Sequence, residues 1–193
     1  MQVLCLHGSP RRGSHSAALG EAFCRAAAAR GASVSTHRLA DLDYGGCRAC
    51  MACKGERGTC VVRDGLEPVM EEVRRAEILA LTTPVYFGEV TAQLKAFIDR
   101  TYHFLPPDYG EGGRSRLSPG RKLLLFQTQG NPDEEAYADI FPRYEFFFRW
   151  FGYEDNHLVR ACGTGPGAET PALAAAMERA RELAHRLIPP PGT

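Results

Sequence analysis

The sequence lacks an excess of charge of either sign, because 23 basic residues stand against 23 acidic ones. The sequence contains no basic run and no row of interleaved aromatic residues, which are the features that indicate a nucleic-acid surface. It also lacks a long apolar run: the opening segment, MQVLCLHGSP, reaches glycine and proline by position 10. Such a segment is typical of a buried strand, whereas a membrane helix needs ~20 apolar residues. We therefore expect a cytoplasmic protein that binds neither nucleic acid nor a membrane.

The chain also lacks an internal repeat or a linker, and its 193 residues suit one domain. Strand-like and helix-like patterns alternate instead. Apolar stretches typical of strands lie at 3–7, 33–39, 78–86, 122–130 and 157–163. Helical patterns follow them at 14–30, 64–77, 91–104, 132–152 and from Thr170 onward. We expect a single domain over residues 1–188 and a disordered tail at 189–193.

This alternation predicts an α/β domain in which helices cover both faces of a parallel sheet. Five strands favour the doubly wound, flavodoxin-like order 2-1-3-4-5, with a ligand at the carboxyl ends of the first and third strands. Asp64 and Glu67 are spaced as a capping box, and Pro142 should break or kink the fourth helix. Two irregular segments interrupt the alternation: the cysteine insert (45–60), after the second strand, and a flap (105–121) rich in glycine and proline.

The segment GSPRRGSHS, residues 8–16, joins the first strand to the first helix. It lacks the G-x-G-x-x-G turn of dinucleotide sites and the lysine of a triphosphate-binding loop. It offers the hydroxyls of Ser9, Ser14 and Ser16, the Arg11 guanidinium and the free N–H groups of a helix N-terminus. These groups suit a terminal phosphate such as that of FMN. The alternative is that Ser14 or Ser16 only caps the helix, which leaves the other groups unexplained.

A second interpretation of this region is a phosphatase loop. Cys5 to Arg11 fits C-x2-G-x2-R, in which a thiolate attacks a phosphate held by arginine. However, Cys5 lies deep in the predicted strand, Arg12 stands where a serine or threonine would assist, and no aspartate loop offers a general acid. A small buried side chain is the better interpretation of Cys5.

Four segments, taken together and in order, resemble a known family. They are GSPRRGSHSAAL, CRACMACKGERGTC, TTPVYFGEVTAQLKAFIDR and TQGNPD, within residues 3–160. The likeness is to the multimeric flavodoxins of the NADPH-dependent FMN reductase superfamily, and within it most to the archaeal-type iron–sulfur flavoproteins. The run PVYF with QLKAFIDR is its most specific part. The resemblance therefore implies that the chain binds FMN.

The resemblance also implies which residues hold the FMN. The phosphate would be bound by Ser9, Arg11, Ser14, His15 and Ser16, where His15 replaces a frequent asparagine but keeps its backbone donor. The isoalloxazine ring would lie along Pro84, Val85, Tyr86, Phe87 and Gly88. The ribityl chain and pyrimidine edge would meet Thr128, Gln129 and Gly130. An aromatic neighbour favours a flavin, and backbone N–H groups stabilise its reduced form; the alternative for Tyr86 and Phe87 is ordinary core packing.

The cysteine insert contains four of the seven cysteines, spaced C-x2-C-x2-C-x6-C. In a reducing compartment such a group is more typical of a metal or catalytic site than of disulfides. On a helical turn the first three would project within ~120° of one another, so they could reach one centre. Ferredoxin-type clusters share this core, whereas structural zinc more often pairs two C-x2-C motifs.

By resemblance, the ligands of a [4Fe–4S] cluster would be Cys47, Cys50, Cys53 and Cys60. Free thiols without a cluster, and a zinc ion, are the alternatives that the spacing leaves open. Cys24 and Cys162 are expected to be buried and without a role.

These features predict an FMN-dependent oxidoreductase that needs no catalytic acid or base. Electrons would pass from NAD(P)H, or from a ferredoxin-like donor if the cluster is present, to a quinone, an oxygen species or another small-molecule or protein acceptor. An electron-carrier flavodoxin is an alternative, although such carriers are strongly acidic; a phosphatase using Cys5 and Arg11 is another. The resemblance further implies a homodimer or homotetramer with the insert and the flap at its interfaces.

Overall fold

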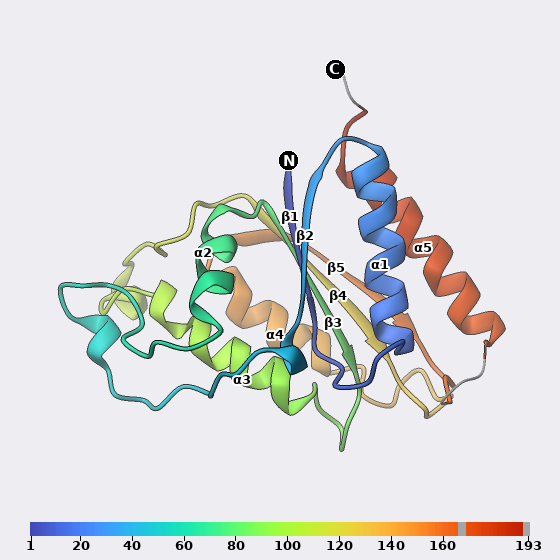
Figure 1. The fold of residues 1–193 in the computed structure, drawn as a ribbon, viewed down its shortest axis with the longest axis horizontal. Coiled ribbons are helices and arrows are strands. Elements are labelled where there is room, and N and C mark those ends of the chain that lie inside the picture. The colour runs from blue at the N-terminus through green and yellow to red at the C-terminus, as the bar shows by residue number, and fades with distance from the viewer. Residues whose placement is uncertain (166–168, 191–193) are drawn as a thin grey trace.

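The computed structural model describes residues 1–165 and 169–190. Its five strands are parallel and lie in the order β2-β1-β3-β4-β5, which confirms the predicted order. The strands are β1 (Gln2–His7), β2 (Ser33–Arg38), β3 (Ile78–Pro84), β4 (Arg121–Thr128) and β5 (Tyr153–Ala161). The α-helices are α1 (His15–Ala29), α2 (Glu67–Arg75), α3 (Ala92–Arg100), α4 (Ile140–Arg149) and α5 (Pro171–Leu187). Figure 1 shows α1 and α5 on one face of the sheet and α2, α3 and α4 on the other.

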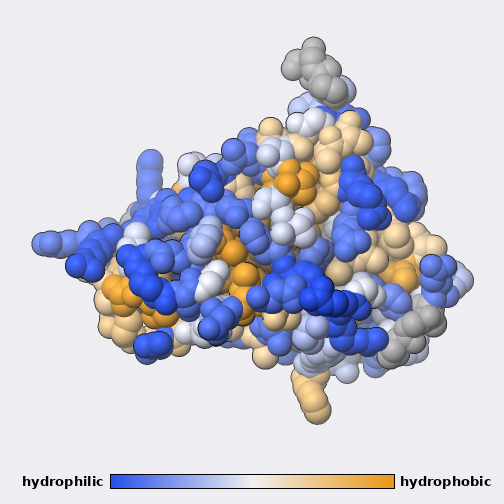
Figure 2. Space-filling view, viewed as in Figure 1, coloured by the Kyte–Doolittle hydropathy of each residue, from blue (hydrophilic) through white to orange (hydrophobic). Residues whose placement is uncertain are grey.

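Each face of the sheet buries its own apolar core. In β1, Leu4 and Leu6 pack with α2, α3 and α4, whereas Val3 and Cys5 pack with α1 and α5. Because successive strand residues point to opposite faces, a strand covered on both sides is apolar at every position. Figure 2 shows hydrophilic residues over much of the molecular face in view, with patches of hydrophobic residues among them. No helix within the described ranges is long and apolar enough to cross a membrane.

Hydroxyl caps fix where three of the helices begin. Ser14 accepts a hydrogen bond from Ala17 N at the start of α1, and Thr91 accepts one from Leu94 N at the start of α3. Thr170 caps α5, whose first residue is Pro171, as its sequence predicts. The predicted capping box at α2 is wrong: Leu66 is the N-cap residue, and Asp64 lies outside the helix. Its carboxylate instead accepts from Leu66 N and binds Arg100.

The helix predicted at 132–152 is shorter, because its first residues form turns. Asn131 and Asp133 each accept a hydrogen bond from the backbone N–H two residues on, which competes with a helix. Helix α4 therefore starts at Ile140, and Pro142 lies in its first turn, where its missing N–H costs nothing. The expected break at Pro142 is wrong. Of the tail predicted as disordered, residues 191–193 lie outside the described residues.

Glu72 ties α2 to the edge strand β2, and this contact makes stability depend on pH. Burial works to raise the pKa of Glu72, but hydrogen bonds from Ser35 and His37 outweigh it and hold the pKa below its usual 4.5. A carboxyl group with a lowered folded-state pKa stabilises the fold above its unfolded-state pKa. That contribution is lost as the pH falls through the folded-state pKa.

We expect Glu72→Gln to lower the free energy of unfolding by about 1.5–3 kcal/mol at pH 7, because it loses charge-assisted hydrogen bonds. The loss should shrink as the pH falls below about 4.5. Urea unfolding at pH 7 and in a series down to pH 3 checks this, with Glu71→Gln, an exposed neighbour on the same helix, as control. An equal loss at every pH would contradict the assigned ionisation.

Candidate functional site

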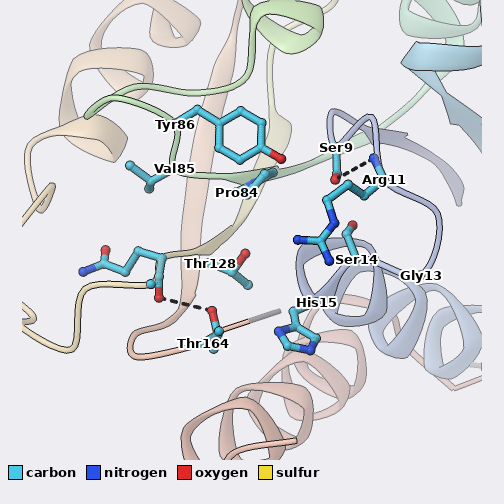
Figure 3. Close-up of a pocket in the computed structure, with 13 residues that line it drawn as sticks. Ser9, Arg11, Gly13, Ser14, His15, Pro84, Val85, Tyr86, Thr128 and Thr164 are labelled. Carbon is cyan, nitrogen blue, oxygen red and sulfur yellow. Dashed lines mark hydrogen bonds between the residues drawn. The ribbon is translucent and has the colours of Figure 1, made fainter. Parts of the chain in front are cut away.

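A cavity of about 320 Å³ opens at the carboxyl ends of β1, β3 and β4, where the loops that follow these strands meet. Figure 3 shows the residues around it. Its lining includes ten residues that the sequence analysis singles out: Ser9, Arg11, Ser14, His15, Pro84, Val85, Tyr86, Thr128, Gln129 and Gly130. Three more come with them: Gly13, Thr164 and Gly165. The fold therefore gathers residues that lie more than a hundred positions apart.

The first wall is the loop from β1 to α1. Gly8 N donates to Thr82 O at 2.8 Å, and Thr91 Oγ1 donates to Gly8 O at 2.7 Å, so this loop is bound to both ends of the β3–α3 connection. A Cβ at Gly8 would lie 2.8 Å from Thr82 O and 2.9 Å from Leu94 Cβ, which only glycine avoids. The close approach keeps the loop against β3.

Polar groups of this loop face the cavity. Ser9 Oγ accepts from Arg11 N at 3.2 Å, and Figure 3 shows the Arg11 guanidinium extending past Ser14. Ser14 caps α1, so the predicted capping role and a role in the cavity wall coincide. Ser16 is buried beneath Ser14 and does not line the cavity. Gly13, at φ 65°, makes the turn into the helix.

The second wall follows β3 and is apolar. Val85 N donates to Thr128 O at 2.8 Å, which aligns Pro84, Val85 and Tyr86 beside the end of β4. Tyr86 and Glu89 exchange two backbone hydrogen bonds and so close a two-residue turn. Phe87 (φ 50°) and Gly88 (φ 77°) occupy the tip in left-handed conformations. Phe87 is fully exposed, and neither residue lines the cavity, unlike the arrangement that the resemblance implies.

The third wall joins the ends of β4 and β5. Gln129 N donates to Ala161 O, and both the backbone N–H and the hydroxyl of Thr164 donate to Gln129 O. The Gln129 side chain is turned away from solvent and binds Asn131 O and Asp133 O. The sequence analysis misses Thr164 and Gly165, although their place after the fifth predicted strand puts them at the same sheet edge.

Cys5 cannot act as a phosphatase nucleophile from its position in the fold. It is completely buried in β1 and does not line the cavity. A hydrogen bond with Cys24, followed by burial, raises the pKa of the Cys5 thiol well above its usual 9.0. A neutral, inaccessible thiol is a poor nucleophile. The interpretation of Cys5 as a core residue is the one that the structure supports.

A second hollow, which shares no lining residue with the first, lies in the cysteine insert. Figure 1 shows the insert at the far end of the molecule from the β1–α1 loop. All four clustered cysteines line it, Cys47, Cys50, Cys53 and Cys60, together with Arg100, Tyr102 and His103 from the end of α3 and the turn after it. Cys47 and Cys50 are exposed, whereas the other two are half-buried.

The insert is not the helical turn that the spacing favours. Ala49 (φ 50°) and Met51 (φ 58°) are left-handed residues, one between each successive pair of the first three cysteines. A short 3-10 turn, Ala52–Lys54, contains only the third. The described residues contain no group of three or more histidine, cysteine or acidic side chains placed to hold a metal. The four thiols thus share one hollow without being gathered around one point.

Cationic side chains fasten the insert to the flap and to α3. Lys54 Nζ donates to Tyr102 O and Leu105 O, both at 2.7 Å, and lies 3.5 Å from the centre of the Tyr102 ring. Arg116, from the flap, donates to Cys53 O and to His103 O. Positive charge therefore surrounds a hollow whose own lining contains no carboxylate.

Arg100 is the most buried of these cations. Burial by itself would lower its pKa, but hydrogen bonds to Asp64 and the nearby Cys60 and Asp64 groups raise it. The same contact outweighs burial at Asp64 and lowers the pKa of that carboxyl group. The two groups stay ionised as a pair.

Residues 1–184 match a family described as having a flavodoxin-like fold. This chain belongs to the flavodoxin-like fold family. It is 33% identical over 101 residues, 52% of each chain, to an iron-sulfur flavoprotein from Methanosarcina thermophila. It is 34% identical over 126 residues to an FMN-dependent NADH:quinone oxidoreductase from a Bradyrhizobium species, covering 60% of this chain and 62% of that one. The chain spans about half the length of the first of these relatives.

Solved structures share the fold of this flavodoxin-like chain over nearly its whole length. An NAD(P)H:quinone oxidoreductase from Methanothermobacter marburgensis has a TM-score of 0.77 and 22% identity over 97% of this chain and 98% of that one. An FMN-dependent NADH-azoreductase from Bacillus anthracis, solved in complex with FMN, has a TM-score of 0.73 and 21% identity over 97% and 99%. At these identities the likeness shows the shared fold.

The tight contact at Gly8 gives a test of the first wall. We expect Gly8→Ala to lower the free energy of unfolding by about 1–3 kcal/mol, because the added Cβ forces the loop away from Thr82 and Leu94. Gly110→Ala is the matched control, since no atom lies within 4 Å of its Cβ position. Chemical denaturation of both variants measures the difference, and equal stabilities would contradict the close packing of the loop.

Proposed function

We propose that this chain binds FMN in the cavity at the carboxyl ends of β1, β3 and β4, and that it is an FMN-dependent oxidoreductase. One observation carries the proposal: a hydroxyl- and arginine-bearing helix start, an apolar wall and a strand-end backbone meet around one cavity of about 320 Å³. This volume lies at the lower end of the range typical of ligand sites, which are about 300–1,000 Å³.

The first wall suits the FMN phosphate. Ser9, Arg11 and Ser14 offer two hydroxyls and a guanidinium, and they stand at the N-terminus of α1, whose unpaired N–H groups favour an anion. No acidic side chain lines the cavity to oppose a phosphate. The loop lacks the glycine-rich turn that binds the two phosphates of a dinucleotide, so it suits a ligand with a single terminal phosphate.

The other two walls suit the isoalloxazine ring and its polar edge. Pro84, Val85 and Tyr86 present an apolar surface, and Tyr86 remains partly exposed beside the cavity. The turn that contains Gly130, and the residues Thr164 and Gly165 beside it, would hold the polar edge. When bound, FMN supplies the acceptor for a hydride or for single electrons. The chain itself binds, orients and partly shields the ring, and no side chain in the cavity lining needs to move a proton.

The electron donor and acceptor are inferred from the relatives. Proteins named FMN-dependent NADH:quinone oxidoreductase are 30–34% identical to this chain over half of its length or more. We infer NAD(P)H as the donor and a quinone-like or other small-molecule acceptor. A homodimer or homotetramer, which the resemblance implies, stays a prediction.

We also propose that the cysteine insert holds a [4Fe–4S] cluster, as the iron-sulfur flavoproteins among the relatives suggest. Four thiols line the hollow, no carboxylate competes, and Arg48 and Arg100 among the lining residues balance the negative charge of metal-bound thiolates. Metal binding and loop ordering are coupled, so a cluster would itself draw the four thiols together. A cluster would supply one-electron transfer and would add a ferredoxin-like protein to the suitable donors.

The phosphate contact is tested by replacing each of two neighbouring arginines, Arg11 and Arg12, in turn. Arg11→Met should weaken FMN binding about 10- to 100-fold, because it removes charge-assisted hydrogen bonds worth about 1.5–3 kcal/mol. Arg12→Met is the matched control, because Arg12 is exposed, pairs with Asp41 and does not line the cavity. Quenching of flavin fluorescence measures both dissociation constants. Equal affinities in the two variants would place the phosphate elsewhere.

The cluster is tested on protein purified without oxygen. We expect flavin absorption with a broad shoulder near about 400 nm, and about four irons and four sulfides per chain. Cys53→Ser should lose most of the iron while retaining FMN, and Cys162→Ser, outside the hollow, should lose neither. Flavin without metal would make the insert a set of free thiols, and zinc in place of iron would make it a structural site.

A further inference from the structure

Arg100, the last residue of α3, holds the two ends of the cysteine insert together. Its side chain is only 1% exposed. Nη1 donates to Gly45 O at 2.9 Å, just before the first clustered cysteine, and Nη2 donates to Val62 O at 3.3 Å, just after the last. The same two nitrogens bind the Asp64 carboxylate at 2.6 and 3.3 Å. One guanidinium therefore closes the loop in which all four cysteines lie.

These contacts use both terminal nitrogens of Arg100 but not its third donor, Nε. Each terminal nitrogen of a guanidinium carries two N–H groups and Nε carries one. Each terminal nitrogen has two acceptors here, whereas the buried Nε has no hydrogen-bond partner among the described residues. A buried charged donor without a partner destabilises the fold. Closing the loop does not require this donor, so its burial needs another reason.

The hollow that Arg100 lines offers sulfur acceptors, and these are stronger acceptors when the thiols are ionised. Arg100 and Cys60 both line the hollow, and the Cys60 thiol interacts with the Arg100 side chain. A neutral thiol is a weak acceptor, whereas a thiolate accepts strongly from a charged donor. A cysteine that coordinates a metal does so as the deprotonated thiolate.

We propose that Arg100 is a positioning residue for the cysteine site, and that its Nε–H donates to the sulfur of Cys60 once that sulfur is a metal-bound thiolate. The proposal rests on the cluster proposed above. The two terminal nitrogens hold the ends of the insert and the Asp64 carboxylate, while Nε selects the fourth ligand. Hydrogen bonds to cluster sulfurs and nearby positive charge stabilise the reduced, more negative state, so Arg100 raises the reduction potential of the site.

Arg100→Lys separates the Nε donor from the charge, since lysine keeps the positive charge but lacks the planar fork. We expect this variant, loaded with iron and sulfide without oxygen, to hold a cluster whose equilibrium constant for one-electron reduction is at least tenfold lower than in the wild type. Tenfold is about 59 mV for one electron. A potentiometric titration followed by electron paramagnetic resonance measures the shift.

Asp64→Asn is the matched control. It removes the other half of the same ion pair and weakens loop closure but leaves Nε in place. Because it also removes a negative charge, electrostatics moves its potential upward or leaves it unchanged, opposite to Arg100→Lys. A role limited to holding the loop would loosen the insert in both variants and shift both potentials in the same direction.

A second measurement needs no change at Arg100. Protein carrying ¹⁵N-arginine, with its cluster reduced, should show a weak hyperfine coupling to an arginine nitrogen in pulsed electron paramagnetic resonance. The coupling should persist in Arg48→Lys, which removes the other arginine that lines the hollow. Its absence, or its loss in Arg48→Lys, would overturn the role of Arg100.

The outcomes distinguish this inference from the proposal on which it rests. Wild-type protein that takes up no iron or sulfide contradicts the cluster and the Arg100 role together. A loaded wild type whose potential is unchanged in Arg100→Lys contradicts the Arg100 role alone and leaves the cluster standing. A downward shift in Arg100→Lys without one in Asp64→Asn supports both.

Discussion

The close contact between the β1–α1 loop and the end of β3 is the constraint on which the cavity depends. Gly8 binds Thr82 and Thr91 through its own backbone N–H and carbonyl group, and a side chain there would separate the two strands' loops. Thr91 also caps α3, so one hydroxyl fixes both the loop before α1 and the start of α3. Because of this contact, the apolar wall and the N-terminus of α1 line the same cavity.

The molecule keeps its two candidate redox sites apart and builds them by different means. The cavity proposed for FMN rests on strand ends, whose positions are set by the sheet and by two apolar cores. The cysteine hollow rests on an irregular insert that has no strand or α-helix of its own and is held by three cations, Lys54, Arg100 and Arg116. A site of the first kind is formed before its ligand arrives, whereas one of the second kind is completed by its ligand.

The sequence predicts the strand order, and it predicts Ser9, Arg11 and Ser14 from the chemistry of their own loop, whereas the family resemblance implies the other seven predicted residues of the cavity. These residues meet because parallel strands bring their carboxyl ends to one edge. The resemblance implies that Phe87 lies along the flavin ring, but the turn closed by two backbone hydrogen bonds between Tyr86 and Glu89 leaves Phe87 exposed and outside the cavity lining. Thr164 follows a strand without any motif. The spacing of the cysteines favours a helical turn, but left-handed residues at Ala49 and Met51 replace it. In the sequence, Arg100 is only one residue within a predicted helix. The structure shows that its side chain binds both ends of the cysteine insert.

The central claim is that this chain turns over electrons through bound FMN instead of carrying them passively. Anaerobic rapid mixing of the FMN-loaded protein with NADH, and separately with NADPH, tests it most directly. The account predicts that at least one of the two bleaches the bound flavin at a rate that rises with nucleotide concentration, and that a quinone then restores its absorption. Bound flavin that neither nucleotide reduces would contradict the account and leave an electron carrier as the function of the fold.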